Sequence, residues 1–181
     1  MIPLILRAGK FTMDHHDLNL RPLRFEEIET LRSIEKSARL RYAGWDGLEM
    51  VVDAPSIAPE RFLSGETVVA EIDGKCVGYV LMQPLDGLMY IASIMVAADF
   101  SGSGVGAAFL DVVESRAKDS NLSGVMLTTF RAPRWNGPWF RKFGFGPMPE
   151  ERIGPCLRAI LDRHATVLDM SKRETLWVEW T

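Results

Sequence analysis

A glycine-rich loop is the part of this sequence with the clearest chemical use. Ser101-Gly102-Ser103-Gly104-Val105-Gly106 lies between an almost wholly apolar segment, 88–96, and a segment with helical periodicity. The N–H groups at the start of a helix have no intrahelical acceptor and stand at the positive end of the helix dipole, so they bind anions. Glycines let the backbone approach such an anion closely. The pattern therefore favours a phosphate-binding loop over a simple strand-to-helix turn.

Two nucleotide-binding patterns compete for this loop. A P-loop requires Gly-Lys-Ser/Thr, whereas apolar residues follow Gly104 and Gly106 here. A dinucleotide fingerprint is closer, because Gly102, Gly104 and Ala107 satisfy its relaxed form. Arg131, after the next strand, could then contact a 2′-phosphate. A dinucleotide fold repeats βαβ units, and this sequence predicts only one crossover, so an NADP(H)-dependent oxidoreductase is a minor alternative.

Turn residues and hydrophobic periodicity predict the strands before the loop. Asp73-Gly74 and Asp86-Gly87 join three strands of a meander, over 67–72, 76–82 and 88–96. Glycine at such a turn accepts the positive φ that a tight hairpin requires. Because the third strand is apolar throughout, we expect both of its faces to be covered.

The remaining elements complete a mixed sheet. A helical crossover should make the strand over 124–130 parallel to 88–96. The stretch 44–60, rich in Gly, Pro and Asp, is expected to be a loop with at most one short helix near 59–63. Other expected strands are 19–24 and 173–180, and other expected helices are 26–42, 105–120, a short one between Asn136 as N-cap and Gly144, and one within 156–169. This is an α/β or α+β fold with a mainly antiparallel sheet of six to seven strands flanked by helices.

Composition limits the classes of function. The chain has 181 residues, 47% of them hydrophobic and 25% charged, which indicates a single globular domain. We expect this domain over 18–181, after a disordered leader over 1–17. Met13, within that leader, is a second candidate start. The net charge of −3 argues against a nucleic-acid partner. Two cysteines and three histidines offer neither a disulfide framework nor a metal site, so we expect a cytoplasmic protein without a metal. No apolar run is long enough to span a membrane.

Two segments resemble signatures of one enzyme family. The segment DFSGSGVGAAFLDVV, 99–113, resembles the pyrophosphate loop and following helix of the GNAT superfamily, the general N-acetyltransferases that use acetyl-CoA. Gly104 and Gly106 take that pattern's glycine places, and Ser101 takes the place of its Arg or Gln. The segment PRWNGPWFRKFGF, 133–145, resembles the family's second signature. Both occur in order, and the predicted elements match from 19 to 180, so the chain is identified as a member of this superfamily.

The resemblance implies a fold and a cofactor site. It implies that strand 88–96 diverges from strand 124–130 and that the pantetheine arm of acetyl-CoA pairs with strand backbone in the gap. A backbone N–H near Ile94 would polarise the thioester carbonyl. The implied cofactor-binding residues are Ile94, Met95, Val96, Ser101, Gly102, Ser103, Gly104, Val105, Gly106, Ala107, Asn136 and Phe140.

Three positions depart from the family's pattern. Ser101 replaces Arg or Gln, which predicts weaker phosphate binding by backbone donors alone. Ala92 and Ser93 stand where members often carry a Glu that deprotonates the amine. Phe140 stands where they often carry a Tyr that protonates the departing thiolate. A CoA thiol with a pKa near 8.5, by analogy with Cys, can leave unprotonated.

Other residues must therefore supply proton transfer. Ser93 could hold a water, Glu35 is a candidate base and Tyr42 a candidate acid. Further candidates are Asp46, Glu49 and Asp53 as bases and Tyr90 as an acid. The resulting prediction is an acyltransferase that moves acetyl from acetyl-CoA to a primary amine of a small molecule or peptide by direct attack. The alternative is a non-catalytic acyl-CoA sensor or interaction protein on the same fold. Acidic residues in 44–60 hint at a cationic acceptor, and a homodimer is a candidate assembly.

Overall fold

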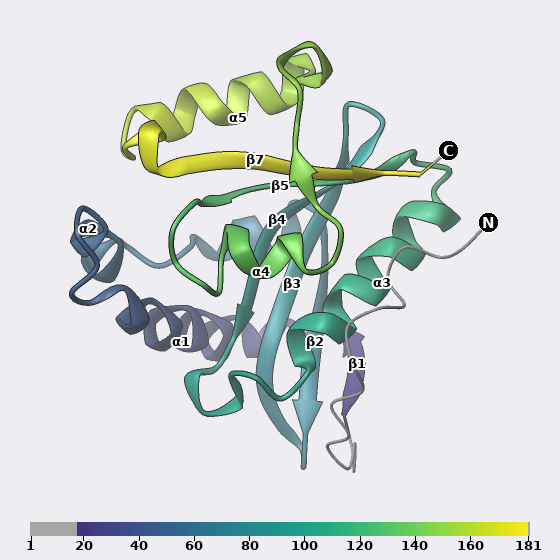
Figure 1. The fold of residues 1–181 in the computed structure, drawn as a ribbon. Coiled ribbons are helices and arrows are strands. Elements are labelled where there is room, and N and C mark those ends of the chain that lie inside the picture. Colours follow the sequence, from purple (N-terminus) through teal and green to yellow (C-terminus); the bar gives the residue numbers. More distant parts are fainter. Residues whose placement is uncertain (1–17, 181) are drawn as a thin grey trace. The chain divides into compact units, whose positions relative to one another are not determined.

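A single seven-stranded sheet organises the chain. The structure is a computed structural model that describes residues 18–180, so the expected leader, 1–17, lies outside the described residues. The strand order is β1-β2-β3-β4-β5-β7-β6 (Figure 1). Pairing is parallel between β4 and β5, and antiparallel for β1 with β2, β2 with β3, β5 with β7, and β6 with β7. The mainly antiparallel sheet and the parallel crossover were both correctly predicted. The strands are β1 (Asn19–Pro22), β2 (Glu66–Ile72), β3 (Lys75–Leu85), β4 (Leu88–Val96), β5 (Gly124–Phe130), β6 (Gly146–Pro147) and β7 (Arg173–Glu179).

The helices agree with the sequence prediction except at two places. They are α1 (Ile28–Arg39), α2 (Glu49–Asp53), α3 (Val105–Asp119), α4 (Gly137–Arg141) and α5 (Pro155–Ala165), with short 3₁₀ turns η1 (Phe25–Glu27), η2 (Leu40–Tyr42) and η3 (Pro59–Leu63). The stretch 44–60 was expected to hold at most the helix near 59–63, and this was wrong because α2 is also present. Leu48 is buried and accepts from the N–H of Val51, which anchors the start of α2. The glycines and prolines that indicated a loop lie on either side of it.

The second difference concerns the start of α4. Asn136 occupies the N-cap position as expected, but its side chain caps no N–H of the helix. Its Nδ2 instead donates to the Thr129 hydroxyl at 3.1 Å. The side chain thus ties the helix start to β5 rather than satisfying the helix's own amides.

The chain forms two compact units. The first, which we call the α1 unit, comprises residues 18–82 and 93–110. Its core holds the apolar face of α1, with Ile28, Leu31, Ile34 and Ala38 all buried as the periodicity predicted. On β3, Tyr79 is fully buried and its ring meets that of Phe62 edge-on, with centroids 5.2 Å apart.

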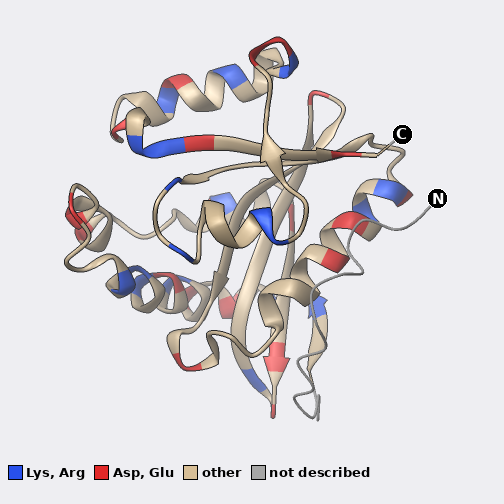
Figure 2. Cartoon of the chain, viewed as in Figure 1, with Lys and Arg blue, Asp and Glu red and all other residues tan. Residues whose placement is uncertain are grey.

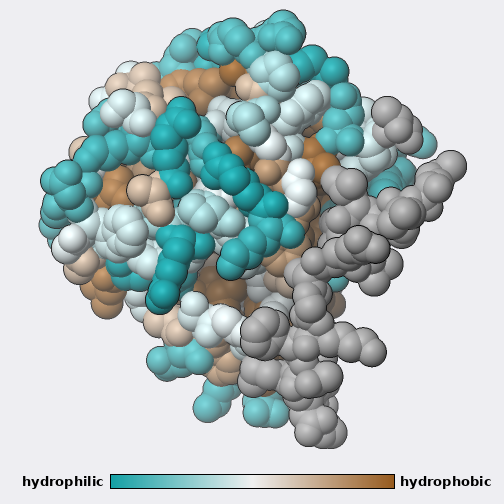
Figure 3. Space-filling view, viewed as in Figure 1, coloured by the Kyte–Doolittle hydropathy of each residue, from teal (hydrophilic) through white to brown (hydrophobic). Residues whose placement is uncertain are grey.

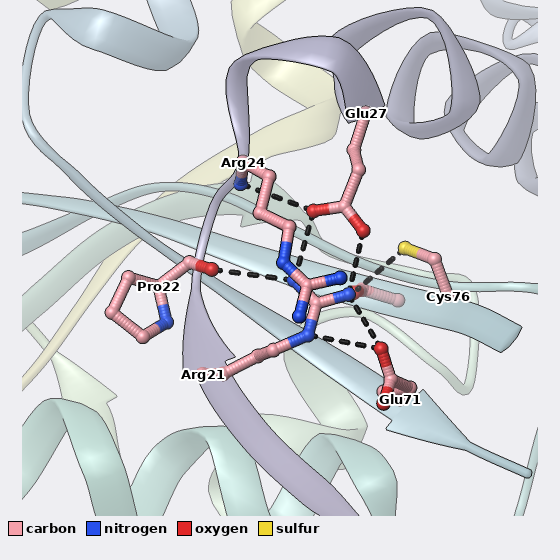
Figure 4. A network of polar contacts seen from close by, with 7 residues as sticks. Arg21, Pro22, Arg24, Glu27, Glu71 and Cys76 are labelled. Carbon is pink, nitrogen blue, oxygen red and sulfur yellow. Dashed lines mark hydrogen bonds and ion pairs between the residues drawn. The ribbon is translucent and has the colours of Figure 1, made fainter. Parts of the chain in front are cut away.

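An ion-pair network fastens the first strand to this unit (Figure 4). The Arg21 guanidinium donates to Glu71 on β2, at 2.9 and 2.6 Å, and to Glu27 in η1, at 2.8 and 2.5 Å. Glu27 also accepts from the backbone N–H of Arg24 at 3.0 Å. Because all three charged side chains are largely shielded, the Arg21 hydrogen bonds hold the pKa of Glu27 below its usual range. One cation thereby connects a strand, its neighbour and the start of α1.

The second unit, which we call the α5 unit, comprises residues 83–92 and 111–180. Helix α5 packs Leu157 and Ile160 into a core cluster with Leu88, Tyr90 and Met126 from the sheet. Trp177 on β7 packs against this cluster, and the Arg152 guanidinium lies 4.6 Å from the centre of its ring. No helix within residues 18–180 is long and apolar enough to cross a membrane. The face shown in Figure 3 is mainly hydrophilic, with hydrophobic residues visible between polar ones.

Candidate active site

The second half of β4 differs from the first in exposure. Leu88–Ile91 are buried, whereas residues 92–96 are only half-buried. The expectation that the whole strand is covered on both faces was therefore wrong for its second half. The parallel register of β4 with β5 runs over Met89, Tyr90 and Ile91, so strand backbone beyond these residues can pair with an added ligand or peptide. Residues Ile94, Met95 and Val96, expected to bind pantetheine, lie in this half-buried part.

Neighbouring elements of the α1 unit hold the end of β4 in place. The N–H of Ala97 donates to the Val77 carbonyl of β3 at 2.8 Å. The Arg41 guanidinium donates to the Val96 carbonyl at 3.2 Å. Gly78 lets the strands come close, because a Cβ at this position would lie 2.6 Å from the Met95 carbonyl oxygen. The backbone expected to contact the thioester is thus fixed by contacts on β3 and η2.

The glycine loop leads from β4 into α3 as the sequence predicts. Gly102 and Gly104 have φ of +85° and +89°, the region that glycine enters without strain. The loop closes on itself, since the N–H groups of Ser101 and Ser103 donate to Ala98 and Phe100 at 3.1 and 3.2 Å. The Ala108 N–H of α3 donates a hydrogen bond back to the Gly104 carbonyl of the loop at 3.0 Å.

The amides that remain for an anion are those at the start of α3. Helix α3 begins at Val105, so the preceding loop presents the positive end of its dipole. Ser101, Gly102 and Gly104 are exposed, which leaves the approach open. The N–H groups at the start of α3 are thus the backbone donors that suit a pyrophosphate, and the Ser101 side chain adds no positive charge.

A polar pair joins the half-buried part of β4 to the buried Tyr79 of β3. The Tyr79 hydroxyl is 3.0 Å from the Ser93 hydroxyl, and either can be the donor. Burial raises the pKa of Tyr79, and the negative charge of Glu35 raises it further. Tyr79 therefore keeps its proton at any physiological pH. Ser93 stands in the place of the family's usual Glu. The Tyr79 hydroxyl can donate a hydrogen bond to Ser93 or accept one from it.

Glu35 on α1 is the carboxylate whose negative charge acts on Tyr79. It lies on the core-facing side of α1 and is half-buried, and its Oε2 accepts from the N–H of Ile57 at 2.9 Å. One turn on, the Arg39 guanidinium, only 5% exposed, donates to the Ala54 carbonyl at 2.6 Å and the Ser56 hydroxyl at 3.2 Å. Helix α1 thus fixes the loop after α2 through two charged side chains placed one helical turn apart.

The other carboxylates proposed from the sequence are placed differently. Asp46, Glu49 and Asp53 are exposed on η2–α2 and its flanks, where solvent screens them. Tyr42 is buried in η2. Among residues 18–180, no group of three or more His, Cys, Asp or Glu is placed to hold a metal ion.

The second motif, in the α5 unit, builds a packed corner. Phe140 is 3% exposed and its ring lies 4.8 Å from Trp139 and 5.6 Å from Phe145, which favours a core role for it. The Arg141 guanidinium donates to both oxygens of the buried Glu174, at 2.9 and 2.5 Å. Sequence reasoning missed Tyr79, Arg39 and this ion pair. The signal for Arg39 was a charged side chain beside the apolar face of α1, whereas Tyr79 gave none, because its ring alone fits an apolar strand.

The comparison with sequence families decides the classification. The profile of the acetyltransferase (GNAT) family matches residues 29–145, which is more than half of the chain. The chain belongs to the GNAT acetyltransferase family. Both glycine-loop and second-motif residues lie within the matched range.

Solved structures of this family share the fold of this GNAT protein. The PaiA N-acetyltransferase of Thermoplasma acidophilum, in complex with coenzyme A, superposes with a TM-score of 0.67 at 14% identity, covering 91% of this chain and 99% of that one. Arabidopsis thaliana Naa50, in complex with the bisubstrate analogue CoA-Ac-MVNAL, gives 0.61 at 15%, covering 90% and 99%. The ribosomal-protein-S18-alanine N-acetyltransferase of Escherichia coli gives 0.62 at 12%, covering 90% and 94%. Coenzyme A in such relatives agrees with the expectation that acetyl-CoA is the co-substrate.

Proposed function

We propose that this GNAT protein transfers the acetyl group of acetyl-CoA to a primary amine of a small molecule or peptide. One continuous segment of the α1 unit, 93–106, carries the proposal. It combines the half-buried part of β4, the glycine loop with its positive φ angles and the start of α3. Acetyl-CoA, when bound, supplies the activated thioester. The chain's own residues bind it, orient it and remove the amine's proton.

Binding would rest on backbone donors. The amides from Gly104 to Ala107 would bind the pyrophosphate, because a helix start leaves them without intrahelical acceptors. Backbone groups of Ile94–Val96 would pair with pantetheine. An N–H near Ile94 would stabilise the charge that develops on the thioester oxygen.

Proton removal would use Ser93, Tyr79 and Glu35. A free amine has a pKa of about 8–10 and must lose a proton to attack. Ser93 would orient the amine or a water beside it, with its hydroxyl held by Tyr79 at 3.0 Å. Glu35, the half-buried carboxylate of α1, would receive the proton through water. Tyr79 acts through Ser93 and is a positioning residue.

The acceptor would carry its amine past α1 and the loop after α2. The bisubstrate analogue in the plant relative's structure joins CoA to an acetylated peptide, which supports a peptide amine as one option. The exposed acidic residues within and just before α2, Asp46, Glu49 and Asp53, favour a cationic acceptor. The cytoplasm remains the expected location.

The test begins with calorimetric titration of acetyl-CoA, followed by acetylation of an amine panel read by mass spectrometry. We expect acetyl-CoA to bind and at least one primary amine to be acetylated. Binding without acetylation of any amine would favour the non-catalytic acyl-CoA sensor. A folded protein that binds no acetyl-CoA would refute the proposal.

Two variants then test the proton path. Glu35→Gln should lower kcat by about 10²-fold or more, because a positioned base contributes that much, while the Kd for acetyl-CoA stays unchanged. The deficit should shrink as pH approaches the amine's own pKa, since less deprotonation is then needed. Glu26→Gln, which removes an exposed carboxylate of the same unit that has no role in the proposal, is the matched control and should leave kcat unchanged. Equal loss in both variants would refute the role of Glu35.

A further inference from the structure

A cavity of about 270 Å³ lies within the α5 unit, formed by residues that no step of acetyl transfer has used. It lies where the ends of β5 and β6 and the start of β7 meet η5 (Glu150–Arg152) and α5. Its apolar lining includes Met148, Ile153, Leu161 and Met170. Arg131, Arg158 and Arg173 supply cationic groups, Glu150 and Glu174 anionic groups, and Thr128 and Thr175 hydroxyls. Basic and acidic residues both occur along α5 and at the start of β7 in Figure 2.

The inner part of the lining is fixed by packing and hydrogen bonds. The Arg173 guanidinium donates to the Thr128 hydroxyl at 2.9 Å and lies 4.7 Å from the centre of the Phe130 ring. Tyr90 places its hydroxyl 3.4 Å from the same Thr128 oxygen. The Thr128 hydroxyl and the Phe130 ring thus hold the Arg173 guanidinium in place within the lining.

Arg131 adds a positive charge that Glu174 does not need, because Glu174 has another partner. Glu174 is already bound through both oxygens by Arg141, which does not line the cavity, so its negative charge is matched. Arg131 lies 3.5 Å from the same carboxylate and its side chain is 57% exposed, which makes it a second, weaker partner. A carboxylate shared by two guanidiniums leaves one positive charge over.

The third arginine is held only loosely. Arg158 pairs with Glu150, but the two side chains are 45% and 74% exposed. An exposed pair of this kind contributes little free energy, so the guanidinium can exchange Glu150 for another anion at little cost. Arginine's planar fork binds carboxylate and phosphate oxygens two at a time.

We propose that this cavity binds a small organic anion, a carboxylate or a phosphate monoester on a short apolar stem. Arg131 and Arg158 would bind the anionic head at the mouth, and the stem would lie among Met148, Ile153 and Leu161. The volume suits a ligand somewhat below drug size, since drug-sized ligands occupy roughly 300–1,000 Å³. Every residue named belongs to the α5 unit, and none of them is among the residues proposed to bind acetyl-CoA or to take the amine's proton.

The test uses three probes with the same stem. They are 3-phenylpropanoate, 3-phenylpropyl phosphate and 3-phenylpropylamine, titrated into the full chain by calorimetry with ligand-observed NMR. We expect at least one anion to bind with a Kd near 1 mM, a usual value for a fragment of this size, and the amine not to bind. Whichever anion binds more tightly shows which of the two head groups the cavity prefers. Amine binding as strong as that of both anions, or no anion binding at about 10 mM, would overturn the proposal.

Matched variants show whether binding occurs at this cavity. Arg131→Gln with Arg158→Gln should weaken the better anion about tenfold or more, because each removes a charge-assisted hydrogen bond. Arg152→Gln is the control, since its side chain is 44% exposed, close to that of Arg158, and it pairs with Glu179 outside the cavity. It should change the affinity by less than about twofold. Weakening by the control equal to that by the double variant would place the anion elsewhere and overturn the proposal.

Discussion

Replacing Gly78 with alanine tests how tightly β3 and β4 must approach. The added Cβ would lie 2.6 Å from the Met95 carbonyl oxygen, 3.2 Å from Cε2 of Phe109 and 3.3 Å from the Val96 Cα. Favourable contacts begin at about 3.5 Å, so the shortest of these falls short by roughly 0.9 Å. The Phe109 ring can turn, but the Met95 oxygen belongs to the backbone. The end of β4 must therefore move away from β3 or remain strained.

The displacement sets the size of the expected effects. Overpacking of a tight interior costs about 1–3 kcal/mol, and for a chain of this length each kcal/mol lowers Tm by about 2–4 °C. Gly78→Ala should thus lower Tm by several degrees. The strand that moves carries Met95 and Val96, whose backbone is proposed to pair with pantetheine. Losing one such hydrogen bond, worth about 1 kcal/mol, would weaken acetyl-CoA binding about fivefold.

Scanning calorimetry and titration of acetyl-CoA measure the two effects on the same protein. Gly146→Ala is the matched control, because Gly146 is also a strand glycine but its added Cβ would meet nothing within 4 Å. An unchanged Tm for Gly78→Ala would refute the packing argument. A lowered Tm with unchanged acetyl-CoA affinity would keep the packing argument and refute the assignment of Met95 and Val96 to the cofactor.

Two further substitutions test buried polar groups. Burial and the charge of Glu35 raise the pKa of Tyr79 above its ordinary 10.0, so the folded state keeps a proton that the unfolded state releases above pH 10. The free energy of unfolding should therefore fall as pH rises past about 10. Urea unfolding at pH 8 and pH 11 should show a smaller fall for Tyr79→Phe than for the unchanged protein. An identical pH dependence of the two proteins would contradict the raised pKa. Gly137→Ala would place a Cβ 2.0 Å from Glu174 Oε1 and 2.8 Å from Arg141 Nη1. Disrupting this pair should cost about 2 kcal/mol or more of unfolding free energy, and a loss below about 0.5 kcal/mol would contradict the stated clash.

Local chemistry explains why most elements were predictable. Asp73 and Gly74, like Asp86 and Gly87, all adopt positive φ in the two hairpin turns, which is the behaviour that these residue pairs favour. The apolar run 88–96 matches β4 at both ends. Helix α2 escaped prediction because five residues give almost no periodicity, and it is stabilised by the burial of Leu48 rather than by its own sequence pattern.

The candidate site was predictable only in part. The loop 101–106 carries its own signature in glycines, so its position before α3 followed from sequence. Tyr79 did not, because within an apolar strand its ring alone explains its presence. The hydrogen-bond partner of its hydroxyl, Ser93, lies beside it only once the chain has folded. Glu35 was easier to single out from the sequence, because a carboxylate on the apolar face of α1 requires a hydrogen-bond partner. That partner is the Ile57 N–H.

The two outermost strands limit how this protein can associate with itself. β1 has four residues and ends at Pro22, whereas β6 has two and ends at Pro147. Open strand edges are where β-proteins aggregate or join sheets, and proline together with brevity removes the main-chain groups that such joining needs. Among the described strands, neither end of the sheet offers a template for continued pairing. A dimer of this protein is therefore expected to form through side-chain surfaces, and the sheet itself should resist templated β-aggregation.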